Sequence, residues 1–169
     1  MKYLTMLQIV FLVLMSCSSL SWKEYKDNIN HFIVKYPEKW QTKTSVNAVA
    51  FLSPREGEHD LFQENVNLML QDLSQQPLTL ERYTEITKKQ IVDNLGSSAI
   101  VSLKSTTLSG QPAQEFIYNM NYQGRVLKIK QVWFIKGTIA YLFTYTAEPN
   151  KYDKYLDIST EIINSFKFI

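Results

Sequence analysis

The chain of 169 residues has one cysteine, two histidines, five glycines and five prolines. A single cysteine excludes disulfides within the chain, so the core alone must hold the fold. The two histidines do not form a His-Glu-x-x-His motif, and neither a Gly-x-Ser-x-Gly turn nor a phosphate-binding glycine loop is present. We therefore predict that the protein is not an enzyme.

A strong charge of one sign and a long hydrophobic run are also missing. The chain has 18 basic against 16 acidic residues, and no basic cluster follows its length, so we expect no nucleic-acid binding. The apolar run from Leu4 to Met15 is shorter than the ~20 residues that a membrane-spanning helix needs. A cleaved leader is the better interpretation of that run.

The leader has the pattern of a bacterial lipoprotein signal peptide. Lys2 supplies a positive start, and Leu14-Met15-Ser16-Cys17 ends the apolar run on a cysteine, as a lipobox does. Met15 is an unusual residue at its position, and ordinary signal cleavage after Ser21 is the alternative. Acyl chains on Cys17, palmitate among them, would hold the mature protein stably on a membrane.

These features predict three parts of the chain. Residues 1–16 are expected to be the signal peptide, residues 17–22 the acylated cysteine with a short tether, and residues 23–169 one folded domain. No repeat or linker divides that last part. The expected location is extracytoplasmic, anchored by lipid on the periplasmic face of a membrane or at the cell surface.

The apolar periodicity predicts an α+β domain in the order three strands, a helix, four strands and a helix. Gly110, Gly124 and Gly137 fall where tight hairpins need positive φ, so the last four strands are expected to form an antiparallel meander. We expect an antiparallel sheet of about six to seven strands flanked by helices. The expected strands are 32–36, 46–53, 66–70, 99–108, 113–122, 125–135 and 138–147, and the expected helices are 80–95 and 149–166.

Several of these segments resemble the PsbP family, whose best-known members are extrinsic subunits of the photosystem II oxygen-evolving complex. The resemblance extends to bacterial DcrB-type lipoproteins. It is carried by residues 32–40 (FIVKYPEKW), 49–54 (VAFLSP), 65–68 (NVNL), 140–147 (AYLFTYTA) and 165–166 (SF). The resemblance implies an αβα sandwich that acts as an accessory or assembly factor at a membrane.

One polar loop has a composition that suits a metal ion. It carries Glu56, Glu58, His59 and Asp60. Carboxylates with an imidazole can bind calcium, manganese or zinc. The residues lack a defined ligand spacing, and Arg55 beside them would oppose a cation, so a solvated loop is the alternative.

Aromatic residues in the last strands offer a second candidate site. They are Tyr118, Tyr122, Trp133, Phe143 and Tyr145. Such side chains could line a pocket for an apolar ligand between sheet and helix, or form a docking surface for a protein. The alternative is that they are core residues or cross-strand partners.

Together these observations predict a membrane-anchored lipoprotein whose domain is a non-catalytic accessory or protein-binding factor. A protein partner of unknown identity is expected. The alternative is a protein that binds a metal or an apolar ligand, including a photosystem II accessory lipoprotein if the source is photosynthetic.

Overall fold

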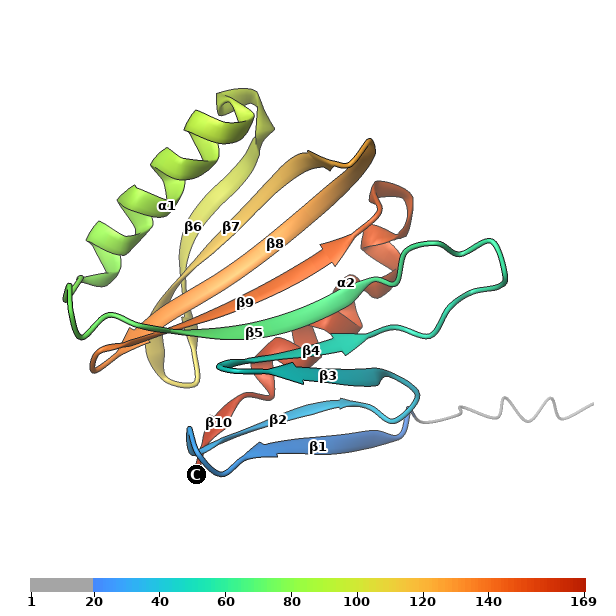
Figure 1. The fold of residues 1–169 in the computed structure, drawn as a ribbon, viewed down its shortest axis with the longest axis horizontal. Coiled ribbons are helices and arrows are strands. Elements are labelled where there is room, and N and C mark those ends of the chain that lie inside the picture. The colour runs from blue at the N-terminus through green and yellow to red at the C-terminus, as the bar shows by residue number, and fades with distance from the viewer. Residues whose placement is uncertain (1–19) are drawn as a thin grey trace, which may run out of the picture.

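The computed structural model describes residues 20–169, which form two antiparallel sheets and two α-helices (Figure 1). The leader and Cys17 lie outside the described residues. The strands are β1 (Trp22–Asp27), β2 (Phe32–Pro37), β3 (Gln41–Ser45), β4 (Ala48–Leu52), β5 (Asn65–Asp72), β6 (Ile100–Leu108), β7 (Gln111–Tyr122), β8 (Arg125–Lys136), β9 (Ile139–Ala147) and β10 (Lys167–Phe168). The helices are α1 (Leu80–Leu95), a short 3₁₀ turn η1 (Ser97–Ala99), and α2 (Pro149–Asn164).

The main sheet has seven strands in the order β3-β4-β5-β9-β8-β7-β6. A smaller sheet, in the order β1-β2-β10, brings the two ends of the folded domain together. The strand number of the main sheet and the α+β class agree with the sequence prediction. The second sheet was not predicted.

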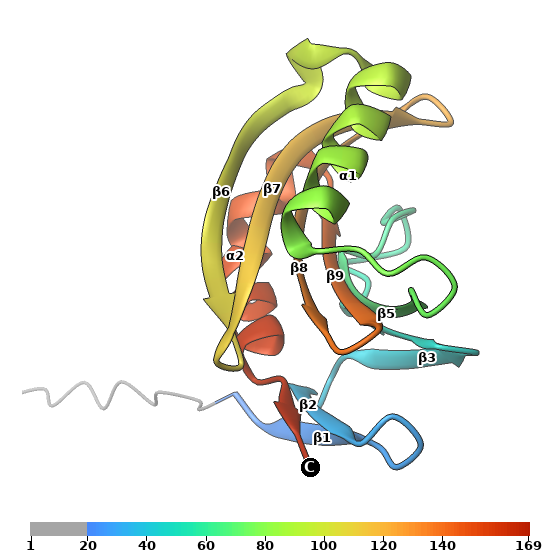
Figure 2. The same cartoon turned by 90° about the vertical axis from the view of Figure 1, so that its left-hand side faces the viewer.

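The two helices lie on opposite faces of the main sheet (Figure 2). Tyr83 and Ile91 of α1 pack with buried residues of β7 and β8, including Phe116 and Trp133. Ile162 of α2 packs with residues of β2, β5 and β9 in a second cluster on the other face. Because side chains alternate across a strand, each long strand contributes to both clusters.

Local signals explain where the helices begin and end. The Thr79 hydroxyl accepts a hydrogen bond from the Arg82 backbone N–H at 3.2 Å, which satisfies a free donor of the first turn of α1. Gly96, at φ 81°, ends α1. Pro149 opens α2 at a position where its missing N–H has no cost.

The hairpin turns have the geometry that their glycines predict. Gln123 and Gly124 both have positive φ, 52° and 81°, as a two-residue turn between right-twisted strands requires. The β6–β7 turn repeats this with Ser109 at 50° and Gly110 at 73°. These turns set the antiparallel pairing of β6, β7 and β8.

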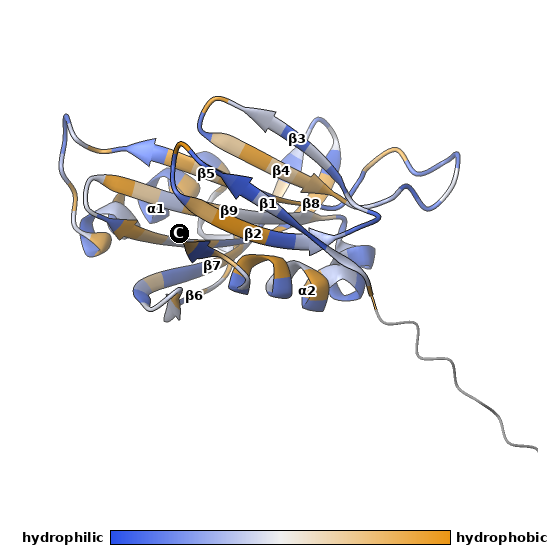
Figure 3. Ribbon diagram, turned by 90° about the horizontal axis from the view of Figure 1, so that it is seen from below, coloured by the Kyte–Doolittle hydropathy of each residue, from blue (hydrophilic) through white to orange (hydrophobic). Residues whose placement is uncertain are grey.

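Three strands escaped the sequence prediction: β10 has only two residues, and β1 and β3 lack an apolar pattern. β1 and β3 are largely hydrophilic, whereas β2 and β4 beside them are hydrophobic (Figure 3). The expected strand 46–53 begins only at Ala48, since Val46 and Asn47 form the turn that joins β3 to β4. Trp22, expected in the tether, is the first residue of β1.

Within residues 20–169, neither α-helix has the length and apolar composition needed to cross a membrane.

Candidate functional site

A loop of residues 53–64, called the acidic loop below, joins β4 to β5 and extends beside the start of α2 (Figure 1). Its base is closed by backbone pairing, because the Ser53 N–H donates to the Glu64 carbonyl at 2.8 Å. The Gln63 side-chain amide donates to the Ser53 carbonyl at 2.6 Å. The loop is thus a closed unit that leaves the sheet and returns to it.

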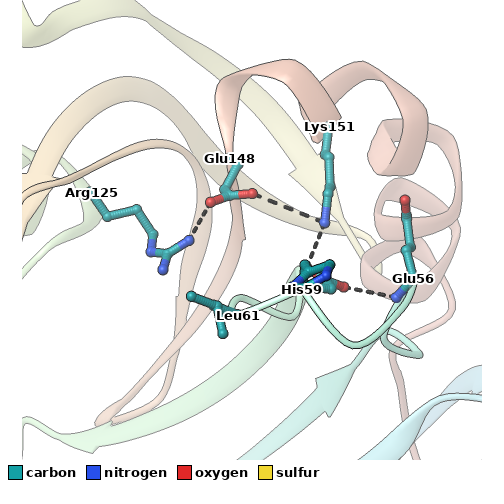
Figure 4. Close-up of a pocket in the computed structure, with 7 residues that line it drawn as sticks. Glu56, His59, Leu61, Arg125, Glu148 and Lys151 are labelled. Carbon is teal, nitrogen blue, oxygen red and sulfur yellow. Dashed lines mark hydrogen bonds and ion pairs between the residues drawn. The ribbon is translucent and has the colours of Figure 1, made fainter.

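An ion pair joins the acidic loop to α2. The Lys151 ammonium donates to Asp60 Oδ1 at 2.7 Å, and Asp60 Oδ2 accepts from the Glu56 backbone N–H at 2.9 Å (Figure 4). Lys151, followed by the Glu56 N–H, holds the pKa of Asp60 below its ordinary value. The same contact raises the pKa of Lys151. Both groups are therefore charged near neutral pH.

A second contact lies one helical turn further along α2. The Lys154 ammonium donates to Glu56 Oε1 at 2.7 Å, and the Tyr155 hydroxyl donates to the same oxygen. The Lys154 and Tyr155 hydrogen bonds lower the pKa of Glu56. Tyr155 itself packs edge-on against Trp40, with ring centroids 6.0 Å apart. Glu56 therefore connects the acidic loop to the aromatic core.

Glu64 at the end of the acidic loop is a fully buried carboxylate. Neither of its carboxylate oxygens has a hydrogen-bond partner within residues 20–169, and Lys151 Nζ lies 3.7 Å from Oε2. Burial raises the pKa of Glu64, against the opposing effect of nearby backbone N–H groups and Lys151. The charge network thus contains one acid that is poorly stabilised in its ionised form.

The acidic loop, the β7–β8 turn and α2 enclose an open pocket of about 300 Å³ (Figure 4). Arg125, the first residue of β8, pairs with Glu148 just before α2 on one side. The Leu61 side chain lies at the pocket edge and is 75% exposed. The pocket is lined by Glu56, His59, Asp60, Leu61, Arg125, Glu148 and Lys151.

The four residues predicted as metal ligands do not converge on one point. Glu56 and Asp60 turn toward lysines of α2, whereas Glu58 and His59 are exposed. Over residues 20–169, no group of three or more His, Cys, Asp or Glu side chains is arranged to hold a metal ion. Calcium, manganese or zinc binding stays a prediction.

Burial contradicts the prediction that the five aromatic residues form one ligand or partner surface. Trp133, Phe143 and Tyr145 are fully buried and Tyr118 nearly so, while Tyr122 is exposed. They also belong to opposite faces of the sheet, since Tyr118 and Trp133 pack toward α1 but Phe143 and Tyr145 pack toward α2. Cross-strand core packing explains them, and they form no common surface.

Tyr118 also lines a cavity that is open to solvent. This shallow cavity of about 200 Å³ is lined as well by Ile91, Leu95 and Met120 at the end of α1. The Trp133 indole N–H, by contrast, is held inside the core by the Thr84 hydroxyl at 3.2 Å. Of these two aromatic side chains, only that of Tyr118 could contact a ligand.

Sequence reasoning missed the α2 side of the site. Lys151, Lys154 and Tyr155 lie at three- and four-residue spacing, which places them together on one helix surface. That spacing could have predicted a shared surface on the helix. The burial of Glu64 could also have been predicted, because Glu64 lies two residues before Val66 and thus in phase with the buried residues of β5.

The sequence matches the family described as PsbP-like protein over residues 15–168. The chain belongs to the PsbP-like family. No curated protein sequence matches it. The family match covers almost the whole described domain and agrees with the resemblance in its strands.

Solved structures with the same fold come from several bacteria. The solution structure of cyanobacterial PsbP (CyanoP) from Synechocystis sp. PCC 6803 has a TM-score of 0.64 at 14% identity, covering 92% of this chain and 99% of that one. PA94 from Pseudomonas aeruginosa, a protein of unknown function and putative regulator, has a TM-score of 0.62 at 16% identity, covering 85% and 94%. LpqN of Mycobacterium tuberculosis, involved in cell envelope biogenesis, has a TM-score of 0.55 at 12% identity, covering 88% and 91%. At these identities the likeness concerns the fold.

Proposed function

We propose that this PsbP-like protein is a lipid-anchored, extracytoplasmic accessory factor without catalytic activity. In this proposal it binds a protein partner at a membrane through the acidic loop and the first turns of α2. The observation that carries the proposal is the Asp60–Lys151 contact, which fixes a protruding loop onto a helix. A loop fixed in advance loses little conformational entropy when a partner binds.

The chemistry of the loop suits a protein surface better than a small molecule. Leu61 offers an exposed apolar contact, and it lies beside the Arg125–Glu148 ion pair. A partner could bury Leu61 while the charged groups around it form a polar rim. The pocket beside Leu61 is open, so a side chain of the partner could enter it.

The anchor proposed at Cys17 would keep this surface close to membrane proteins. Cys17 is followed by only four residues before β1 begins at Trp22, so the domain would stay within about 20 Å of its acyl chains. Among the structural relatives, LpqN is involved in cell envelope biogenesis. That relation supports an envelope role at the level of the fold only.

Cross-linking in intact cells, followed by purification of the full chain, tests the proposal. We expect one membrane protein to copurify in stoichiometric amount, and we expect Leu61→Asp to remove it. Val46→Asp is the matched control, because Val46 is also an exposed apolar residue but lies at the β3–β4 turn. A partner retained by Leu61→Asp, or recovery of the chain alone, would contradict the proposal. Photosystem subunits among the products would identify the photosynthetic branch.

A further inference from the structure

A second polar cavity lies on the other side of α2, between its C-terminal half and strands β6, β7 and β8. Figure 2 shows β6 and β7 curving past this helix. The cavity has a volume of about 210 Å³. Cavities that hold drug-sized ligands measure about 300–1,000 Å³, so this one fits only a smaller molecule.

The polar wall of the cavity contains a buried lysine. The Lys130 side chain is only 10% exposed, and its ammonium donates to the Thr160 hydroxyl at 3.1 Å. Its ion-pair partner, Glu115 Oε2, lies 3.3 Å away. An ammonium has three N–H donors. One donates to Thr160, and the ammonium is paired with Glu115 at 3.3 Å, so Lys130 keeps donor capacity for a group inside the cavity that it lines.

The charges around the cavity do not cancel. Glu115 is shared, because its other oxygen, Oε1, forms an ion pair with Lys104 Nζ at 3.0 Å, and the Lys104 side chain is 64% exposed. Two ammonium groups therefore face one carboxylate, which leaves a net charge of +1. Lys130 and Glu115 are largely buried in the wall, whereas Lys104 lies outside the lining and is partly screened by solvent, so the excess charge is a moderate one that favours a monoanionic ligand.

The end of α2 is the opposing influence, since the last carbonyl groups of a helix carry partial negative charge. Here those carbonyls are already engaged. The Ser165 backbone N–H donates to the carbonyls of Glu161, Ile162 and Ile163. The Phe166 N–H also donates to the Ile163 carbonyl, at 3.2 Å. These hydrogen bonds reduce the opposing effect of the helix end on an anion in the cavity.

The remaining wall of the cavity is apolar, so it suits a ligand with a hydrocarbon group. Leu108, Val132 and Ile163 line it, and all three are buried. We propose that this cavity binds a small organic monocarboxylate. Its carboxylate would accept from Lys130, and its short hydrocarbon body would lie on the three apolar side chains. This site is separate from the acidic loop.

Butyrate is the probe, titrated into the purified full chain while the methyl resonances of Val132 and Ile163 are followed by NMR. We expect saturable shifts with butyrate. Butyramide, butylamine and inorganic phosphate should bind at least tenfold more weakly, because each lacks either the negative charge or the apolar body. Equal affinity for butyramide or phosphate, or no saturable shift with butyrate, would overturn the proposal.

Two variants separate the ligand site from a merely structural ion pair. Lys130→Met should weaken butyrate at least tenfold. Glu115→Gln should instead tighten it, since the net charge around the cavity rises by one unit. Lys128→Met is the matched control, because Lys128 lies on the same strand over the Tyr152 ring, 4.0 Å from its centroid. Unchanged binding in Lys130→Met, or weaker binding in Glu115→Gln, would contradict the site.

Discussion

Lys151 Nζ lies 2.7 Å from Asp60 Oδ1, although the two residues are 91 positions apart in the chain. The contact joins the acidic loop, which follows β4, to the first turn of α2, which follows β9. The proposed partner surface depends on this pairing, because it holds Leu61 and the pocket beside it in one arrangement.

Replacing Lys151 with Met should destabilise the fold by about 2–3 kcal/mol at pH 7, because it leaves Asp60 and Glu64 without their cation. Urea unfolding measures this change in the free energy of unfolding. Lys154→Met is the control, since its pair with Glu56 is more exposed and should cost less than about 1 kcal/mol. Equal losses in the two variants would mean that Lys151 has no special role.

Glu64→Gln should stabilise the protein at pH 7, by about 1–3 kcal/mol, because it removes a fully buried negative charge whose cation, Lys151 Nζ, lies 3.7 Å away. The pKa of Glu64 is raised in the folded state. Folding with Glu64 is therefore favoured below its unfolded pKa, and this contribution is lost as the pH rises through the folded pKa.

The gain from Glu64→Gln should accordingly shrink as the pH falls toward about 4, where unfolded glutamates take up protons. Thermal unfolding at several pH values follows this. Asp60→Asn should behave in the opposite way. The pKa of Asp60 is lowered, so its contribution is present above the unfolded pKa and lost as the pH falls through the folded pKa. A Glu64→Gln gain that does not vary with pH would refute the assignment.

Phe143→Ala should cost about 3–5 kcal/mol, because Phe143 is a fully buried core residue. Tyr122→Ala should change the free energy of unfolding by less than about 0.5 kcal/mol, since Tyr122 is exposed at the end of β7. Chemical denaturation of both variants checks the correction to the predicted aromatic surface. Similar losses would show that the aromatic residues do act as one unit.

The anchor at Cys17 can be tested apart from the fold. Cys17→Ala should abolish incorporation of labelled palmitate and move the protein out of the membrane fraction. The melting temperature should not change, since the described domain begins after this residue. Unchanged acyl labelling would exclude the lipoprotein assignment.

Much of the fold could be predicted because its strongest elements carry their own signals. The Thr79 cap, the spacing of Tyr83 and Ile91, and Gly96 define α1 in the sequence as they do in space. β3 could not be found this way, since all five of its residues are exposed and only its pairing with β4 makes it a strand.

Only the acidic-loop side of the candidate site could be predicted from the sequence. The acidic residues of the loop are close in sequence, so their clustering was visible. Their cations lie on α2, almost a hundred residues later, and no local pattern connects the two segments. The aromatic residues were a poor guide, because alternation along a strand cannot tell a covered face from an open one.

The measurement that tests the proposed function most directly is site-specific photocross-linking of the full chain in intact cells. A photoreactive residue at position 61, on the acidic loop, should give one defined adduct with a membrane protein. The same residue at position 46, which is also exposed and lies at the β3–β4 turn, should give none. Adducts from position 46 alone, or from neither position, would contradict docking through the acidic loop.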